Sequence, residues 1–467
     1  MMRGLARLPL RCFAVFLVAL WCAACASRLP PLSASGQSFT PAADEALLWE
    51  QAAREHRKLS SGLGILRDPI LEDYLTDLVY RLLPPGTREA GVSPSVHVLI
   101  NPSLNAFAYP TGAIYVHSGL IARLENEAQL ATVLAHEVSH IVQRHTVRHL
   151  RQERSKDLWK RIAVVTTPLV LGPMLAPVGI TVSGTNPAVL LQRPSVEHLL
   201  ADQALDSSLE LATRRTPNSR FDPTTTLFTR IQPRFALLAS VHGYQAALIE
   251  EADRFAVEAL ARAGYDPQEA DRTLTRLQAA ATAQTTEEPY WWGRVTAYDG
   301  RIRTLRAALA ALPAVTSGEV RQTDGAEIFR QRTRVLLREN AMAELKLERS
   351  DEAIAQLQRA LGVHGNDPVA HYYLGRAYAA KASDADELRL AAAAYTTATT
   401  VDAAFADAYR ELAMTYTKMG DTDRAAEAQQ SYLALHSELS FFPRSTSPGL
   451  ANPVLLLRPS GTTAPRP

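Results

Sequence analysis

Cysteine is almost absent from this chain of 467 residues, and long apolar runs are rare. Its three cysteines, Cys12, Cys22 and Cys25, all lie within the first 25 residues, so the rest of the chain cannot form a disulfide framework. The apolar run 13–21 is too short to span a bilayer, and the apolar stretch 162–182 is broken by three prolines. These absences exclude a disulfide-stapled small domain and argue against a multi-span membrane protein.

An excess of charge of either sign is also lacking. The whole chain has 49 basic and 48 acidic residues, and three of the basic ones lie in residues 1–24. Without that segment the net charge is near −2. Nothing in this balance favours a nucleic acid or an anionic membrane surface as a partner.

The first 24 residues are typical of an export signal, with three arginines followed by a short apolar core. Small residues precede Cys25 as in a bacterial lipoprotein signal, which predicts lipidation of Cys25, although Cys22 stands where leucine is usual. Simple secretion with cleavage near Ala23-Ala24 is the alternative. Residues 25–43 are then a flexible tether, and we expect a periplasmic protein held by its lipid at a membrane, the outer one in preference.

Hydrophobic periodicity divides the remaining chain into two parts. Residues 44–312 are expected to form an α+β domain, mainly α, with a small sheet and an irregular insert at 183–235. The expected elements are a helix over 44–80, strands at 96–100 and 113–117, a helix starting near Ser118, a long helix from Glu127 to about His149, and a helix from about Phe235 to Ala263. The stretch 162–182 is compatible with a buried hairpin, a lid or a membrane-dipping loop.

A linker at 313–328 leads to a region, 329–437, that repeats with a period near 34 residues. Leu374, Gly375 and Tyr378 recur as Leu412, Ala413 and Tyr416. This pattern favours paired helices of the tetratricopeptide type, and an unrelated alanine-rich bundle is the alternative. Residues 438–467 carry six prolines and are predicted to be a disordered tail.

The motif with the clearest chemistry is His136-Glu137-Val138-Ser139-His140, inside a strongly helical segment. Residues four apart share a helix face, so both imidazoles can bind one metal ion. Two imidazole nitrogens suit zinc, which lowers the pKa of a bound water. Glu137 is predicted to be the general base that takes a proton from this water and later protonates the leaving amine.

The surrounding sequence resembles the zinc peptidases typified by HtpX, the CAAX prenyl proteases and the mitochondrial Oma-type enzymes. The matching residues are Asn105-Ala106-Phe107-Ala108-Tyr109-Pro110-Thr111-Gly112-Ala113-Ile114-Tyr115-Val116, then Ser118-Gly119-Leu120, then 127–145. A lipoprotein signal, this domain and tetratricopeptide-like repeats together are similar to the periplasmic β-barrel assembly-enhancing proteases. The resemblance implies a zincin-like fold, one zinc ion per chain, and Arg144-His145 opening the next helix. Strand 113–117 is either an edge strand that binds substrate or an ordinary internal strand.

The position of the third zinc ligand departs from the family's pattern. The family places a glutamate four residues before the aspartate of an Ala-Asp pair, but Ile249 occupies that position before Asp253. Glu250 shares the face of Asp253 on a helix, whereas Glu251 points about 200° away. We therefore predict Glu250 as the third ligand and Asp253 as a carboxylate that orients another ligand. The alternatives are Glu251, or a site with two ligands and no activity.

Two further departures concern other possible site residues. The family's His-Pro pair before Arg-Ile is replaced by Ala297-Tyr298 before Arg301, so Tyr298 is a candidate hydrogen-bond donor in its place. His198, next to Glu197, is a remote candidate ligand.

The first hypothesis for function is a zinc metalloendopeptidase of the cell envelope that cleaves misfolded outer-membrane proteins. Its repeats would contact protein or peptide substrates and the assembly machinery. The second is a chaperone-like or scaffold lipoprotein with a degenerate site, acting through the repeats alone.

Overall fold

A computed structural model describes residues 29–35, 39–62, 64–152, 246–283, 298–312 and 325–439. Among these, the amino-terminal part contains three strands, β1 (Ser95–Leu99), β2 (Ala106–Ala108) and β3 (Ala113–His117). Its helices are α2 (Leu32–Ser35), α3 (Ala43–Ser60), α4 (Pro69–Leu82), α5 (Ser118–Arg123), α6 (Glu127–Val142), α13 (Ala246–Arg262), α14 (Glu269–Ala283) and α15 (Tyr298–Ala311). The export signal, Cys25, the stretch 162–182, the insert 183–235, His198 and the tail from residue 440 lie outside the described residues.

The sheet has the order β1-β3-β2, with β1 parallel and β2 antiparallel to β3. The hypothesis that strand 113–117 binds substrate at an edge is therefore wrong, because β3 is the central strand. Among the described residues, β2 is an edge of this sheet, and residues 64–66 cover part of the outer side of β1. The three-residue strand β2 was not predicted, because so short a run carries no clear alternation.

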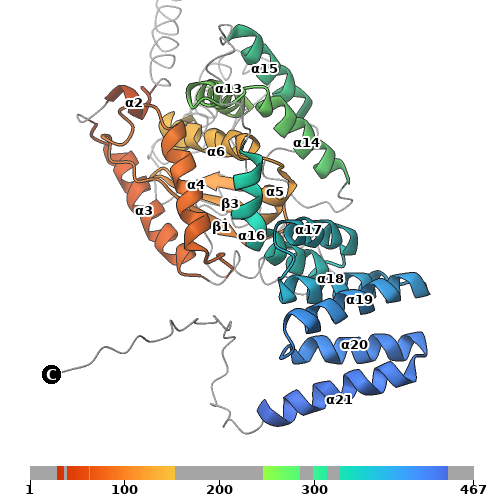
Figure 1. The fold of residues 1–467 in the computed structure, drawn as a ribbon. Helices are drawn as coiled ribbons and strands as arrows, with labels where there is room; N and C mark the ends of the chain where they lie inside the picture. Colours follow the sequence, from red (N-terminus) through yellow and green to blue (C-terminus); the bar gives the residue numbers. More distant parts are fainter. Residues whose placement is uncertain are drawn as a thin grey trace, which may run out of the picture.

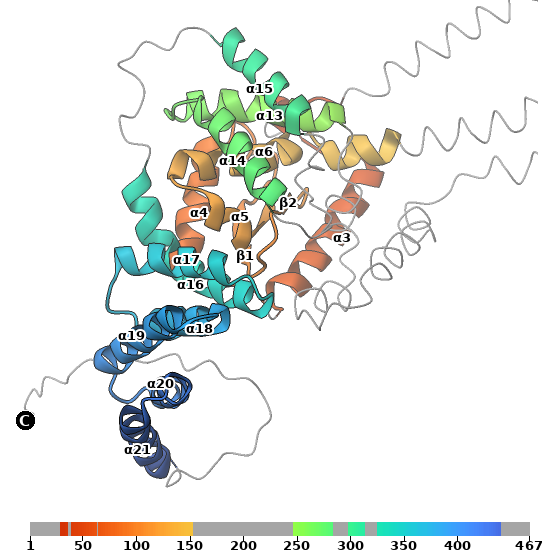
Figure 2. The ribbon, with the colours of Figure 1, turned by 90° about the vertical axis from the view of Figure 1, so that its right-hand side faces the viewer.

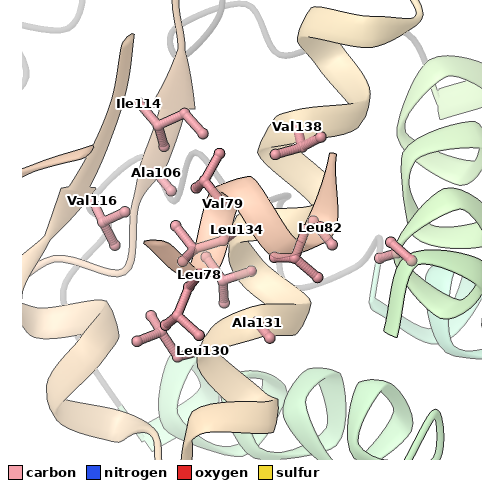
Figure 3. Packing of buried hydrophobic residues seen from close by; sticks show 14 of the residues in the cluster. Leu78, Val79, Leu82, Ala106, Ile114, Val116, Leu130, Ala131, Leu134 and Val138 are labelled. Atoms are coloured by element: carbon pink, nitrogen blue, oxygen red, sulfur yellow. The ribbon is translucent and has the colours of Figure 1, made fainter. Parts of the chain in front are cut away.

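The two faces of the sheet pack against different helices. Alternate side chains, among them Val96, Val98 and Ile114, join α4 and α6 in the main core, and Figure 3 shows this cluster. The opposite face, with Tyr115 and Phe107, packs against α3. The sheet thus lies between α3 on one side and α4 with α6 on the other (Figure 2).

Two predicted helices are interrupted. The expected helix 44–80 is divided into α3 and α4, because residues 64–66 run beside β1: Leu66 N donates to Val98 O at 2.9 Å, and Ile100 N donates to Gly64 O at 2.7 Å. Asp68 then caps α4 by accepting from Leu71 N at 3.1 Å. The expected helix 127–149 ends at Val142, and helix resumes at residue 145 after a turn.

The carboxy-terminal part consists of three helix pairs, as the repeat predicts. They are α16 (Ala326–Lys346) with α17 (Ser350–Val363), α18 (Pro368–Lys381) with α19 (Ala385–Val401), and α20 (Ala406–Met419) with α21 (Thr422–Leu439). At the crossing of α18 and α19, a Cβ on Gly375 would come within 2.7 Å of the Tyr395 ring, so this position requires glycine. Figures 1 and 2 show the pairs extending away from the sheet domain as one stack.

Helix α16 belongs to both parts of the molecule. Phe329 and Leu336 are members of the main core, and the buried Asn340 accepts a hydrogen bond from Ser118 of α5 at 2.6 Å. Asn340 also donates to Gln356 of α17 at 2.8 Å. The first helix of the repeats is therefore packed into the sheet domain. Among the described helices, none combines the length and apolar character needed to cross a bilayer.

Candidate metal centre

Helix α6 carries the His-Glu-x-x-His motif through the middle of the sheet domain. Asn126 caps its start by accepting from Gln129 N at 2.8 Å. All sixteen of its residues are buried, between the sheet, α4 and α13. The motif is therefore held in a rigid, packed element.

His136 and His140 meet one helical turn apart, as predicted. Their Nε2 atoms are 3.1 Å apart, and the two rings are nearly perpendicular, with centroids at 4.8 Å. Two imidazoles on one tetrahedral zinc ion, with Zn–N about 2.0–2.1 Å, would have nitrogens ~3.3 Å apart. The pair therefore fits as two ligands of such an ion.

Asp253 lies on the far side of His136 from His140, as its predicted orienting role requires. Its Oδ1 is 2.9 Å from His136 Nδ1, and Arg301 of α15 donates to both carboxylate oxygens, at 2.9 and 2.7 Å. Burial alone would raise the pKa of Asp253, but the Arg301 charge and the hydrogen bonds lower it. An ionised Asp253 accepts from His136 Nδ1 and leaves the Nε2 lone pair of His136 for a metal.

Burial also keeps the histidines neutral. It lowers the pKa of His136, against the opposing effect of Asp253, and it lowers that of His140 further, with the neighbouring His136 and His145 adding to the effect. Neutral imidazole is the form that binds metal ions. The pair is thus in its metal-binding protonation state at neutral pH.

Two further residues lie at the site: His145, for which no role in the site was predicted, and Glu251, the alternative to Glu250 as third ligand. His145 Nδ1 is 2.7 Å from His140 Nδ1, and Glu251 Oε2 is 3.7 Å from His145 Nε2. Arg148 also contacts Glu251, at 2.9 Å. These contacts, the one with His145 first, lower the pKa of Glu251 to about 2, so it carries a full negative charge at neutral pH.

No hydrogen bond or ion pair among the described residues joins Glu250, the predicted third ligand, to the histidines. Glu251, on the opposite side of α13 from Asp253, contacts the histidine cluster, while Glu250 takes part in no hydrogen bond or ion pair among the described residues. Within those same ranges no group of three or more His, Cys, Asp or Glu side chains is arranged to hold a metal ion. Glu250 as third ligand stays a prediction. The helical-wheel argument placed Glu251 second because it took no account of His145, which approaches α13 from beyond the end of α6.

Glu137 and Tyr298 are both buried near these groups. Glu137 is 3% exposed on α6. Burial lowers the pKa of Arg301, but the charge of Asp253 and, less strongly, that of Glu137 raise it, so the pKa is raised overall. Tyr298 begins α15, and the Arg301 guanidinium carbon lies 5.7 Å from its ring centroid. Tyr298 therefore packs beside the residue that holds Asp253, and its predicted role as a hydrogen-bond donor stays a prediction.

Comparison with known proteins identifies the region around the motif. Residues 71–176 match peptidase family M48. The chain is 33% identical over 136 residues to the β-barrel assembly-enhancing protease of Escherichia coli K12, covering 28% of this chain and 27% of that protein. It is 26% identical over 221 residues to the protein of the same name in Yersinia pestis, covering 47% of this chain and 35% of the other.

A mitochondrial relative matches only around the motif. The metalloendopeptidase OMA1 of Arabidopsis thaliana is 41% identical over 69 residues, 15% of this chain and 13% of that protein. The matched regions thus span about a third or less of the relatives' own lengths.

Solved structures of repeat proteins also match in part. A crystal structure of MamA covers 38% of this chain at 17% identity with a TM-score of 0.22. YrrB, a tetratricopeptide-repeat protein, covers 49% at 17% identity with a TM-score of 0.21. Scores this low carry no argument about the fold, which rests here on the helix pairs themselves.

Proposed function

Because this chain carries a peptidase family M48 domain, we propose that it is a zinc-dependent metalloendopeptidase of the bacterial cell envelope. The observation that carries the proposal is the pair His136 and His140, with Nε2 atoms 3.1 Å apart. The ionised Asp253 holds His136 at 2.9 Å. A metal ion requires such a buried, neutral and oriented pair of imidazoles. A helix with a purely structural role does not require one.

In the proposed mechanism, His136 and His140 would hold one zinc ion, with Glu250 as the proposed third ligand. A zinc ion held there would supply an acidified water and polarise the scissile carbonyl. Glu137 takes the proton from the attacking water and returns it to the leaving amine. Asp253, fixed by Arg301, keeps the proton of His136 on Nδ1, and burial keeps both histidines neutral.

The proposed substrates are outer-membrane proteins during assembly or quality control. This rests on the similarity to proteins named β-barrel assembly-enhancing proteases and on the three helix pairs, which offer a surface for protein or peptide partners. A lipid on Cys25 would hold the chain at a membrane, the outer one in preference, with the domains in the periplasm.

Substitution of the proposed general base tests the mechanism. We expect Glu137→Gln to abolish cleavage of casein or of the chain itself, because glutamine cannot accept the water's proton, while one zinc ion per chain remains bound. Cleavage rate and metal content are measured on the same full-length preparation. Proteolysis at the wild-type rate would contradict the assigned role.

A second candidate function is a scaffold or chaperone without proteolysis. Ile249 at the family's glutamate position, and the absence of a three-residue metal group among the described residues, favour it. Metal analysis distinguishes the two: a chain that retains well under one zinc after gentle purification supports the scaffold, and a full equivalent supports the peptidase.

A further inference from the structure

The end of helix α6 is an unusual turn that decides where His145 points. Arg144 has φ +57°, a left-handed conformation that non-glycine residues rarely adopt. Its guanidinium forms a two-point ion pair with the buried Glu45 of α3, with one contact at 2.9 Å, and donates to Pro30 O at 3.3 Å. These contacts stabilise the turn, and the next residue, His145, faces back towards α6.

The position of His145 fixes the direction of one hydrogen bond. A histidine that binds metal through Nε2 carries its proton on Nδ1. His140 Nδ1 lies 2.7 Å from His145 Nδ1, so His140 is the donor and His145 the acceptor. His145 then carries its own proton on Nε2.

Glu251 faces the protonated nitrogen of His145. The distance of 3.7 Å from His145 Nε2 to Glu251 Oε2 exceeds a direct hydrogen bond but is within reach of an electrostatic contact. Arg148 also contacts this carboxylate, at 2.9 Å. A negative charge at this point favours the proton on His145 Nε2 and leaves His145 Nδ1 free to accept from His140.

The two halves of the site are thus built alike. Asp253 of α13 orients His136 directly. We propose that Glu251 of the same helix, acting through His145, is a positioning residue for His140. This inference rests on the proposed function, since it assigns these residues to the same metal ion.

Metal affinity of the full-length chain tests the proposal. Zinc affinity is measured by competition with a chelator, and the visible absorption of the cobalt-substituted protein reports the geometry at His140. Loss of a group that orients a metal-bound histidine typically weakens metal binding about 10- to 100-fold. We expect a loss in this range for Glu251→Gln and for His145→Gln, with a changed cobalt spectrum, and partial recovery of affinity in Glu251→Asp.

Two controls separate positioning from a structural ion pair. Arg148→Gln removes the Arg148–Glu251 contact but keeps the carboxylate beside His145, and Glu258→Gln removes an exposed carboxylate of the same helix. Both are expected to bind zinc as the wild type does. Circular dichroism of each metal-free variant shows that it is folded.

The outcomes are distinct. If the wild type binds zinc and Glu251→Gln binds it equally tightly, the positioning role is wrong and the proposed function stands. If Arg148→Gln loses as much affinity as Glu251→Gln, the contact is only an ion pair between helices, and the inference also fails. If the wild type itself binds neither zinc nor cobalt, the proposed function fails first.

Discussion

Asp253 and Arg301 form a buried ion pair beside the two histidines. Both are at least 96% buried, and Arg301 binds the carboxylate through two hydrogen bonds while Asp253 also accepts from His136. Two charges are kept in a packed interior only when each satisfies the other. The same pair therefore serves both stability and the orientation of His136.

Replacing Asp253 should affect both properties. In Asp253→Asn the buried Arg301 loses its counter-charge, so we expect a loss of about 3–5 kcal/mol in the free energy of unfolding. Zinc affinity is expected to fall about 10- to 100-fold. Urea unfolding of the metal-free protein and chelator competition measure the two effects.

Asp271→Asn is the matched control, because Asp271 pairs with the solvent-exposed Arg306 on α15. This variant should change neither quantity much, since exposed ion pairs contribute little. Equal losses of stability and zinc affinity in the two variants would show that burial does not make the Asp253–Arg301 pair more important than an exposed ion pair.

At the scale of elements, the junction between β3 and α5 contains a buried histidine outside the metal centre. His117 is 2% exposed, and its Nδ1 is 2.7 Å from Ser103 Oγ. Burial lowers the pKa of His117 to about 3. His117 is therefore neutral in the folded chain at every pH at which the domain is expected to function.

The lowered pKa of His117 predicts that the folded chain becomes less stable as the pH falls. Below about 6.5 the unfolded chain takes up a proton at His117 that the folded chain does not, so unfolding becomes more favourable. Well above pH 6.5, His117 does not change the free energy of unfolding. As the pH falls towards about 3 the loss in this free energy grows, and it is about 2 kcal/mol at pH 5 from His117 alone. Urea unfolding of metal-free protein at pH 7.5 and pH 5 measures it.

His117→Asn is the comparison, because asparagine can keep a hydrogen bond to Ser103 and does not titrate in this range. Its stability should fall less between the two pH values than that of the wild type. The half-buried His97 also contributes to the wild-type slope, since partial burial lowers its pKa to about 4, so a residual dependence is expected. An unchanged slope in His117→Asn would contradict the assignment.

At the scale of the whole molecule, the first repeat helix completes the sheet domain. Phe329 and Leu336 of α16 are fully buried in the main core. Arg359 of α17 donates to the carbonyl oxygens of Ala122 and Leu124. By contrast, α18–α21 form a cluster of their own, and α18 packs on the first pair, α16 and α17, through Ala370 and Ala377.

Truncation should therefore have opposite results at two points. A chain ending at residue 366 keeps α16 and α17, and we expect it to retain a cooperative unfolding transition and its zinc. A chain ending at residue 324 exposes the core surface that Phe329 and Leu336 cover, and is expected to lose most of its stability. Calorimetry and zinc content measure both. Equal stability of the two chains would show that α16 is independent of the sheet domain.

The sequence by itself determined the features that depend on local spacing. The four-residue interval of His136 and His140 puts both rings on one helix face, and the repeat near 34 residues gave the helix pairs. Strands β1 and β3 were predicted to within one residue for the same reason. The sequence also predicted that Asp253 orients a metal ligand, but which ligand it contacts, His136, came from the structure.

Only the tertiary structure decided which distant segments meet. Residues 64–66 divide the first helix because they run beside β1, and β3 is central because β2 pairs on its other side. The contact of Glu251 with His145 depends on a turn that an ion pair from α3 stabilises, and Arg301 reaches Asp253 from another helix. Such contacts join residues as far apart in the chain as His145 and Glu251. Periodicity along one element carries no information about them.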